Sequence, residues 1–419
     1  MKKLLSFLVV MAMTLSLFAP VPAQAAAAEG PTIEFVQWFG KEMPDGYLQS
    51  LADKFKEETG ITVELLSNPY ADTKTMLQAS AAAGTLPDVV ALDGPWIYDY
   101  ATQGLLADLG AAFNSIGFDP ADLSMQISVN GTVYAQPIVN FPNLMAVNMD
   151  LLKAAGINEP PKTWTELKED CQKLTDPANN VYGFGMNMST DNATCVENFT
   201  AFCWNSGGTI LTEEGKPFIK DNELFKATCE MFKDLNDSGL CIPGMYTMTD
   251  ADKVEEFVNG RIAFMPDSVA HLNDISQQAP DMNIVYINMP HKDDYDGQAY
   301  CRMNNWACGI SAKSENPEAA AKWIAYLLDQ QVNAELCVTA GGFVVNTKAE
   351  ANYENSSDAF KTIEEVYKTT YGKSEFNSLP TAENLEKILD EALILYLDGD
   401  TTVDEMLADV QEQYDAAYN

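Results

Sequence analysis

The sequence predicts an α/β protein of two lobes, each built on a mainly parallel sheet that is flanked by helices. Its 419 residues exceed the roughly 250–300 residues at which single cores stop growing. Strand and helix patterns alternate along the chain, which favours parallel strands joined by crossover helices. No low-complexity linker divides the sequence. Two lobes would therefore have to be joined by strands that cross between them.

In the first third of the chain, short strands alternate with helices. Residues 61–65 alternate between polar and apolar side chains, which is typical of a strand. Gly60 and Gly84 stand where each helix should end, because glycine readily adopts the left-handed conformation of a helix C-terminus. The expected elements are strands at 33–36, 61–65 and 88–92 and helices at 47–55 and 76–83.

Capping signals mark three later helices. Thr163 with Glu166 and Thr402 with Glu405 have the spacing of a capping box. Asn316 followed by Pro317 favours a helix start with proline in the first turn. The expected elements are helices ending near Leu174, Leu328 and Tyr414 and strands at 181–185, 261–265 and 283–288. Trp164 and Trp323 lie inside these helices and are interpreted as core residues.

The composition excludes several classes of partner. There are 25 Lys and Arg against 61 Asp and Glu, a formal net charge of −36. Nucleic acids and anionic lipids are bound mainly through cations, so both are disfavoured. A hydrophobic fraction of 47% with 10% aromatic residues excludes a disordered acidic chain and indicates a packed core.

The N-terminus predicts export. Lys2 and Lys3 precede an apolar run from Leu4 to Ala19, and Ala23-Gln24-Ala25 follows. This order is that of a secretory signal peptide at residues 1–25, and the run is shorter than the roughly 20 residues of a membrane span. No cysteine follows the cut, so lipid attachment there is not supported. We expect a secreted protein, periplasmic or extracellular.

Eight cysteines, all at or after Cys171, leave two interpretations open. In an exported protein an even count permits disulfides. Cys195 with Cys203 and Cys229 with Cys241 are plausible local pairs, but buried free thiols are equally compatible with the sequence.

No catalytic constellation is visible. His271 and His291 lie outside known metal-binding spacings, and the glycine-containing motifs of hydrolases, phosphate loops and dinucleotide sites are absent. Asp398-x-Asp400 resembles the start of a calcium loop but lacks its glycine, so a polar turn is the better interpretation. We expect no catalytic residue, no metal and no cofactor.

Aromatic, amide and acidic residues gather at the ends of the predicted strands. In open α/β sheets, ligands bind beyond the carboxyl ends of strands. Flat apolar faces suit the C–H surfaces of a sugar, and amides and carboxylates suit its hydroxyls. Arg302, beside this set, could clamp an anionic group or hold a local acid, and Trp204 could lie in the core or in the cleft. The strand-end residues are Trp38, Phe39, Asp93, Trp96, Asn140, Phe141, Asn143, Asn304, Asn305 and Trp306.

Five segments in order along the chain resemble the family 1 extracellular solute-binding proteins of ABC transporters, the maltose-binding-protein-like group. They are FKEETGITVEL, AAGTLPDVVALDGPWIYDYATQGLLADL, GTVYAQPIVNFPNLMAVNMDLLKAAGINEPPKTWTEL, FVNGRIAFM and GISAKSENPEAAAKWIAYLL. The resemblance implies a type II periplasmic-binding-protein-like fold hinged by crossing strands. It implies an N-terminal lobe of 29–140 plus 306–343 and a C-terminal lobe of 143–300 plus 346–419, with the ligand cleft between them.

The resemblance also implies site residues and partners. Asp267 and Ser268 match a loop where the family often has a Gly-Trp pair, but Val269 and Ala270 follow here. For His271 two interpretations stay open, a surface residue or a replacement for that contact, and Phe343 could reach the cleft. The implied partners are a small-molecule ligand, expected to be a sugar, and ABC permease subunits, with the protein itself a monomer.

Three functions remain open from the sequence. The leading one is capture of a mono- or oligosaccharide for import. A second keeps the fold but binds a cation such as a polyamine, neutralised by the cleft acids Glu42, Asp93 and Asp267. A third is a secreted carbohydrate-active enzyme.

Overall fold

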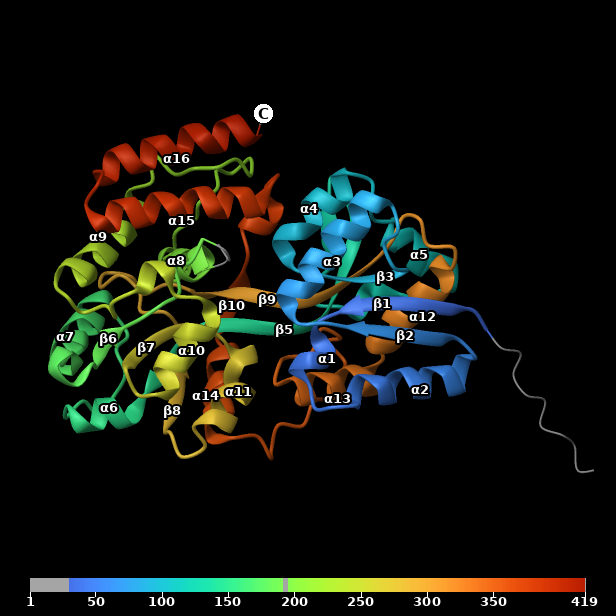
Figure 1. Cartoon of the computed structure of the whole chain (residues 1–419), viewed down its shortest axis with the longest axis horizontal. Coiled ribbons are helices and arrows are strands. Elements are labelled where there is room, and N and C mark those ends of the chain that lie inside the picture. Colours follow the sequence, from blue (N-terminus) through green and yellow to red (C-terminus); the bar gives the residue numbers. More distant parts are fainter. Residues whose placement is uncertain (1–29, 191–194, 419) are drawn as a thin grey trace, which may run out of the picture.

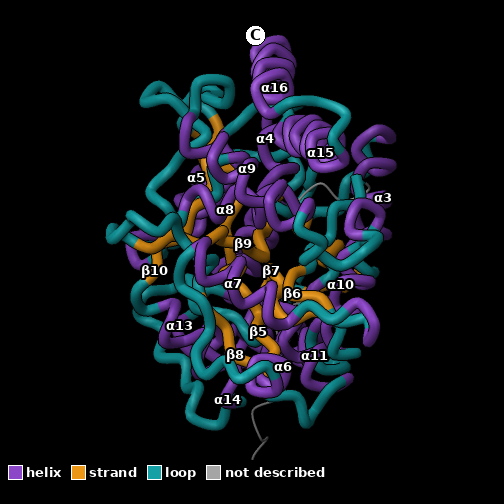
Figure 2. Tube along the Cα trace, turned by 90° about the vertical axis from the view of Figure 1, so that its left-hand side faces the viewer, coloured by secondary structure: helices purple, strands orange, loops and turns teal. Residues whose placement is uncertain are grey.

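The computed structural model describes residues 30–190 and 195–418, so the predicted signal peptide at 1–25 lies outside the described residues. Figure 1 shows two lobes side by side with two long strands, β5 and β9, running through both. Seen from the side in Figure 2, the strands occupy the middle of the molecule and helices lie on both sides of them.

Ten strands form one connected sheet in the described ranges. Its main path runs in the order β2-β1-β3-β9-β5-β7-β6, with β10 on β9 and both β4 and β8 on β5. The strands are β1 (Thr32–Gln37), β2 (Thr62–Ser67), β3 (Val89–Leu92), β4 (Ile127–Val129), β5 (Thr132–Asn148), β6 (Tyr182–Phe184), β7 (Ile262–Ser268), β8 (Ile284–Ile287), β9 (Ala299–Ile310) and β10 (Thr370–Lys373).

The helices cover both faces of this sheet. Those of the first lobe, on the right of Figure 1, are α1 (Phe39–Glu42), α2 (Tyr47–Thr59), α3 (Tyr70–Ala83), α4 (Gly94–Thr102), α5 (Leu109–Ile116), α12 (Pro317–Leu327) and α13 (Gln330–Ala340). Those of the second lobe are α6 (Met149–Ala154), α7 (Trp164–Leu174), α8 (Cys195–Trp204), α9 (Glu223–Asp237), α10 (Asp250–Val258), α11 (Leu272–Gln278), α14 (Asp358–Tyr367), α15 (Ala382–Asp398) and α16 (Val403–Tyr418). None of the helices in the described ranges combines the length and the apolarity needed to cross a bilayer.

The first lobe follows the predicted alternation. Strands β1, β2 and β3 are parallel, and helix α2 buries Leu48, Leu51 and Phe55 against them. Gly60 ends α2 with φ +76°, a conformation that side chains with a Cβ rarely adopt. Helix α3 begins at Tyr70, six residues earlier than the predicted helix at 76–83.

The sheet as a whole is mixed rather than mainly parallel. Strand β9 is antiparallel to both β3 and β5, and β5 is antiparallel to β7 and β8. Parallel pairing holds for β1 with its two neighbours and for β6 with β7. The difference arises because β5 and β9 cross between the lobes. Each crossing strand therefore runs antiparallel to some neighbours whose direction is set by crossover helices.

The local signals in the second lobe and near the C-terminus are confirmed. Thr163 and Glu166 cap each other at the start of α7, and Thr402 with Glu405 does the same before α16. Trp164 and Trp323 are buried, as expected of core residues. All eight cysteines are buried, and no disulfide is present in the described part of the chain.

Candidate functional site

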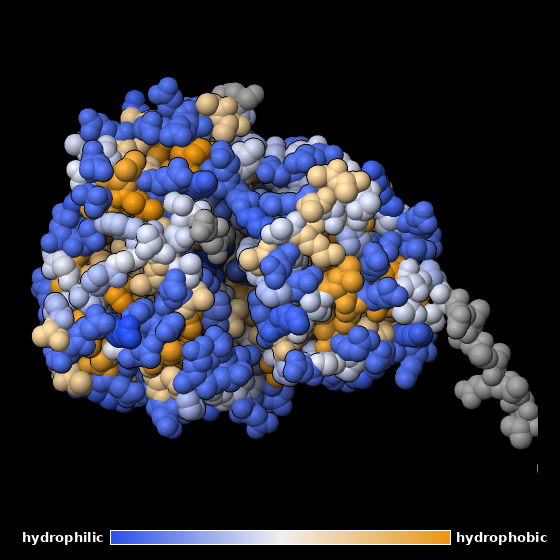
Figure 3. All heavy atoms as spheres, in the orientation of Figure 1, coloured by the Kyte–Doolittle hydropathy of each residue, from blue (hydrophilic) through white to orange (hydrophobic). Residues whose placement is uncertain are grey.

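Side chains from both lobes line a cleft of about 810 Å³. The crossing strands form its floor, through Phe141 and Asn143 of β5 and Arg302 and Trp306 of β9. Figure 3 shows the surface hollowed between the two lobes at this place. The end of β3 contributes Asp93 from the first lobe, as strand-end geometry predicts.

Aromatic rings form the first-lobe side of the cleft. Trp306 is stacked on Phe39, with ring centroids 4.6 Å apart and planes 18° apart, and it also packs on Phe141. Trp38 lies edge-on to Trp96, at 5.9 Å between centroids. Trp38 and Trp306 line the cleft, and Phe39 and Trp96 support them from behind.

Three polar residues form a row across neighbouring strands at the floor. Arg302 of β9 is the register partner of Asn143 of β5, and Asn143 is the partner of Ser268 of β7. The amide nitrogen of Asn143 donates to Oδ1 of Asn198 in α8 at 2.8 Å. The three side chains of the row and that of Asn198 all line the cleft. Polar groups therefore extend across the cleft floor from one lobe to the other.

The acids beside this row already have partners. The Arg302 Nε–H forms an ion pair with Glu197 of α8, and both side chains are almost fully buried. Arg302 thus holds a local acid, one of the two roles predicted for it. Both oxygens of Asp93 accept hydrogen bonds, from the Tyr70 hydroxyl at 2.7 Å and from the backbone N–H of Gly94 at 2.8 Å.

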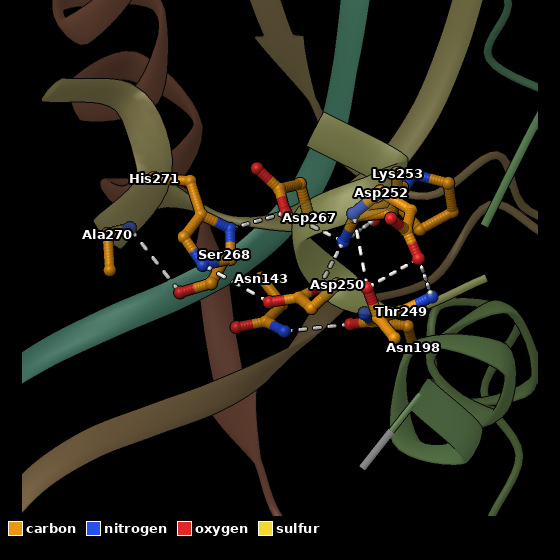
Figure 4. A network of polar contacts seen from close by, with 11 residues as sticks. Asn143, Asn198, Thr249, Asp250, Asp252, Lys253, Asp267, Ser268, Ala270 and His271 are labelled. Carbon is orange, nitrogen blue, oxygen red and sulfur yellow. Dashed lines mark hydrogen bonds and ion pairs between the residues drawn. The ribbon is translucent and has the colours of Figure 1, made fainter. Parts of the chain in front are cut away.

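The second-lobe side carries a network of charges (Figure 4). Lys253 lies 2.8 Å from an oxygen of both Asp250 and Asp267. The ring of His271 lies between the same acids, with Nδ1 2.8 Å from Asp267 and Nε2 3.2 Å from Asp250. Burial disfavours the charged imidazole, but the two carboxylates outweigh it and raise the pKa of His271 to about 9. His271 is therefore a charged residue of the cleft at neutral pH.

Three members of this network offer ligand atoms within 4.8 Å of one another: Asp250, Asp267 and His271. A divalent metal would need these carboxylates free and the imidazole neutral. The Lys253 ammonium instead neutralises both acids, and His271 is held in its protonated form. Among the described residues, the donor set therefore fits an ion-pair network better than a metal site.

The structure brings most of the predicted site residues to one cleft. Those that line it are Trp38, Glu42, Asp93, Phe141, Asn143, Ser268, Arg302, Asn305 and Trp306, together with Asn304. Glu42 lines the cleft, where desolvation raises its pKa to about 7 against the opposing effect of His271.

Other predicted residues lie behind the cleft wall or away from it. Asn140 accepts a hydrogen bond from Asn305 at 2.7 Å, and Asp267 is sealed by Lys253. Phe343 stacks on Tyr367 with centroids 3.8 Å apart. Trp204 is fully buried, and its indole N–H donates to Glu375 at 2.7 Å. Its place in the helix α8 turns the ring into the second-lobe core, so it does not line the cleft.

Several cleft residues were not predicted. They come from helices and loops of the second lobe, apart from Tyr70 and Ala71 at the start of α3. The capping pair Thr249 and Asp252 could have located α10, but not the direction in which Lys253 points. The unpredicted residues that line the cleft include Tyr70, Asn187, Asn198, Asp250, Lys253 and Asp274.

Comparison with known proteins identifies the family. The model of bacterial extracellular solute-binding proteins matches residues 50–366, more than half of the chain. This chain belongs to that family. A binding protein of Brucella abortus is 27% identical to this solute-binding protein over 319 residues, which cover 74% of this chain and 76% of the relative. The galactooligosaccharide-binding protein of Bacillus subtilis is 29% identical over 182 residues, 42% of this chain and 41% of the relative.

Solved structures confirm the two-lobed fold of periplasmic binding proteins. UgpB from Mycobacterium tuberculosis, in complex with glycerophosphocholine, superposes with a TM-score of 0.78 at 19% identity, covering 93% of this chain and 98% of that one. A solute-binding protein from Thermotoga lettingae bound with α-D-tagatose gives 0.77 at 21% identity, covering 93% and 100%. An ABC substrate-binding protein from Listeria monocytogenes with cycloalternan gives 0.75 at 20% identity, covering 92% and 98%.

Proposed function

We propose that this solute-binding protein captures a mono- or oligosaccharide in the cleft between its lobes and delivers it to an ABC permease. The observation that carries the proposal is that two tryptophans, Trp38 and Trp306, line one cleft together with the amides of Asn143, Asn187, Asn198, Asn304 and Asn305. Aromatic faces suit the C–H surfaces of a sugar ring, and amides both donate to and accept from hydroxyls. The relatives and neighbours named above are binding proteins, which favours capture over catalysis.

The strands β5 and β9 cross between the lobes and could act as a hinge when the cleft closes on a ligand. A ligand that contacts both lobes would stabilise the closed arrangement and shift the population towards it. Trp306 and Asp93 line the cleft from the first lobe, and Ser268 and His271 line it from the second. A sugar between them would touch both.

Thermal shift and calorimetric titration against a panel of mono- and oligosaccharides test the proposal. A binding sugar should raise the melting temperature by mass action. Trp306→Ala and Trp38→Ala should each lose this shift while the proteins remain folded. Tyr371→Ala is the control, because Tyr371 is 62% exposed and is not part of the cleft lining. Equal affinities in all three variants would contradict the site, and turnover of the sugar would indicate an enzyme.

A cationic ligand such as a polyamine is the second candidate, favoured by the carboxylate of Glu42 in the cleft. However, the other two acids proposed for this purpose, Asp93 and Asp267, already have partners. Polyamine binding that weakens steeply with salt, without any sugar binding, would support this candidate over the first.

A further inference from the structure

The cleft floor holds buried oxygens that lack hydrogen-bond donors. Asn143 and Asn187 are 1% and 3% exposed and line the cleft, yet Oδ1 of each has no partner. Oε1 of Glu197, whose other oxygen meets Arg302, also lacks one. A buried acceptor without a donor is unfavourable. A ligand that donates in the cleft would satisfy Asn143 and Asn187, which line it, whereas Glu197 lies behind the lining.

Three donor side chains of the cleft, those of Asn143, Lys253 and His271, are already engaged. The Asn143 amide donates to Asn198 (Figure 4), and the Lys253 ammonium serves Asp250, Asp267 and the Pro266 carbonyl. Both ring nitrogens of His271 face carboxylates. A ligand group that only accepts, such as a carboxylate, phosphate or sulfate, would compete for these donors. The remaining cation of the lining, Arg302, pairs with Glu197 through Nε and has Asp93 and Glu386 as further acidic neighbours.

The charge balance behind the floor is also negative. Glu386 of α15 is fully buried, and neither of its oxygens has a hydrogen-bond partner. Its electrostatic neighbours include Glu197, Asp93 and Arg302. One guanidinium thus faces three carboxyl groups, and burial raises the pKa of Glu386 well above its ordinary value and also raises that of Glu197. A cationic group of a ligand nearby would favour the ionised form of these acids.

The spacing of the floor and the aromatic wall indicates the length of the ligand. Both places lie on β9. Arg302 belongs to the polar row of the cleft floor, and Trp306 belongs to the aromatic wall, where it stacks on Phe39. Four residues of strand span about 13 Å at roughly 3.3 Å per residue. A single pyranose ring does not reach both places, whereas a disaccharide or longer chain does.

We propose that the ligand is an oligosaccharide that contains an amino sugar, with its ammonium beside Asn143 and Asn187 and a neighbouring ring against Trp306. The proposal rests on the proposed function of the cleft as a sugar site. An ammonium carries three donors and no acceptor, which matches the unpaired oxygens. It also brings a positive charge towards the buried carboxyl groups behind the floor, and a polyamine would lack the ring that the tryptophans suit.

Calorimetric titration with three matched β-1,4 trisaccharides tests this: the glucosamine trimer, its fully N-acetylated form and cellotriose, with maltotriose as a neutral sugar of another linkage. We expect the glucosamine trimer to bind at least tenfold tighter than the other two members of the matched set at pH 6. Equal or tighter binding of cellotriose or maltotriose would overturn the amino-sugar proposal but leave sugar capture intact. No binding of any sugar in the wider panel would overturn both.

Two variants locate the ammonium. Asn187→Ala should reduce the preference for the glucosamine trimer over cellotriose about tenfold, because it removes one of the acceptors. Asn114→Ala is the control, since Asn114 is exposed in α5 and is not part of the cleft lining. An unchanged preference in Asn187→Ala, with the apo melting temperature preserved, would remove Asn187 from the site.

Discussion

Lys253 and Asp267 form an ion pair at 2.8 Å in which the side chains are only 1% and 0% exposed. One comes from helix α10 and the other from the end of strand β7, so the pair joins the helix to the sheet beneath the cleft. Removing one partner from a buried pair leaves an uncompensated charge, which is more damaging than the loss of the pair as a unit.

We expect Lys253→Met to lower the free energy of unfolding by about 3–5 kcal/mol, as measured by urea denaturation. Lys292→Met is the control, because the ion pair of Lys292 with Asp294 is exposed and should contribute little. The double variant Lys253→Met with Asp267→Asn should recover part of the loss. A single variant as stable as the control would show that Asp250 and Asp267 do not need this cation.

The charge on His271 should make stability depend on pH in the alkaline range. Its pKa is raised from an ordinary 6.5 to about 9 by Asp267 and Asp250, against the opposing effect of burial. The stabilisation is therefore complete below pH 6.5 and is lost as the pH rises through about 9. Melting temperatures of the wild type and of His271→Gln should differ most near pH 6 and converge above pH 9. Parallel curves across this range would refute the assignment.

The cysteines should be unreactive in the folded protein. Burial raises the pKa of Cys203, Cys241 and Cys301 to about 12, so almost no thiolate is present at neutral pH. An aromatic disulfide reagent should react slowly with native protein and with eight thiols per chain in denaturant. Fewer than eight in unreduced, denatured protein would indicate disulfides. In that case we expect the disulfides to join neighbouring thiols, which are Cys203 with Cys229 and Cys171 with Cys241. These differ from the local pairs that the sequence suggests.

An ion pair that joins the two lobes outside the cleft should raise the affinity for the ligand. Lys74 of α3 forms an ion pair with Glu383 of α15, and the backbone N–H of Thr381 donates to Asp99 of α4 at 3.2 Å. If opening separates these elements, the pair favours the closed form. Since the pair is partly exposed, Glu383→Gln should weaken ligand binding by up to about fivefold.

The control for this contact is Lys387→Met, because Lys387 pairs with Glu391 within α15 itself. Titration calorimetry should show an unchanged dissociation constant for this variant, and small-angle scattering should show a larger apo radius of gyration only for Glu383→Gln. A Glu383→Gln variant that binds like the wild type would mean that the contact persists in the open form.

Most of the first lobe was predictable because its signals are local. Strands β1 to β3 carry their own apolar patterns, and Asp93 and Trp306 could be placed at a cleft because they adjoin strands. Lys253 and Asn198 were not predictable, since each lies on a helix whose orientation depends on packing with distant segments. Trp204 shows the same limit. The Asn205-Ser206-Gly207-Gly208 run after it suggests a loop, but the tryptophan is the last residue of α8 and faces the core.

Strand β9 also has a consequence for how the chain reaches its folded state. It pairs with β3, which lies more than 200 residues earlier in the chain, and it separates β3 from β5 in the sheet. The sheet of the first lobe therefore stays incomplete until residues 299–310 have been synthesised. Contacts of such long range form slowly. A chain leaving the ribosome would thus remain without its finished first lobe for most of its synthesis, which is the condition that passage through a membrane channel as an unfolded chain requires.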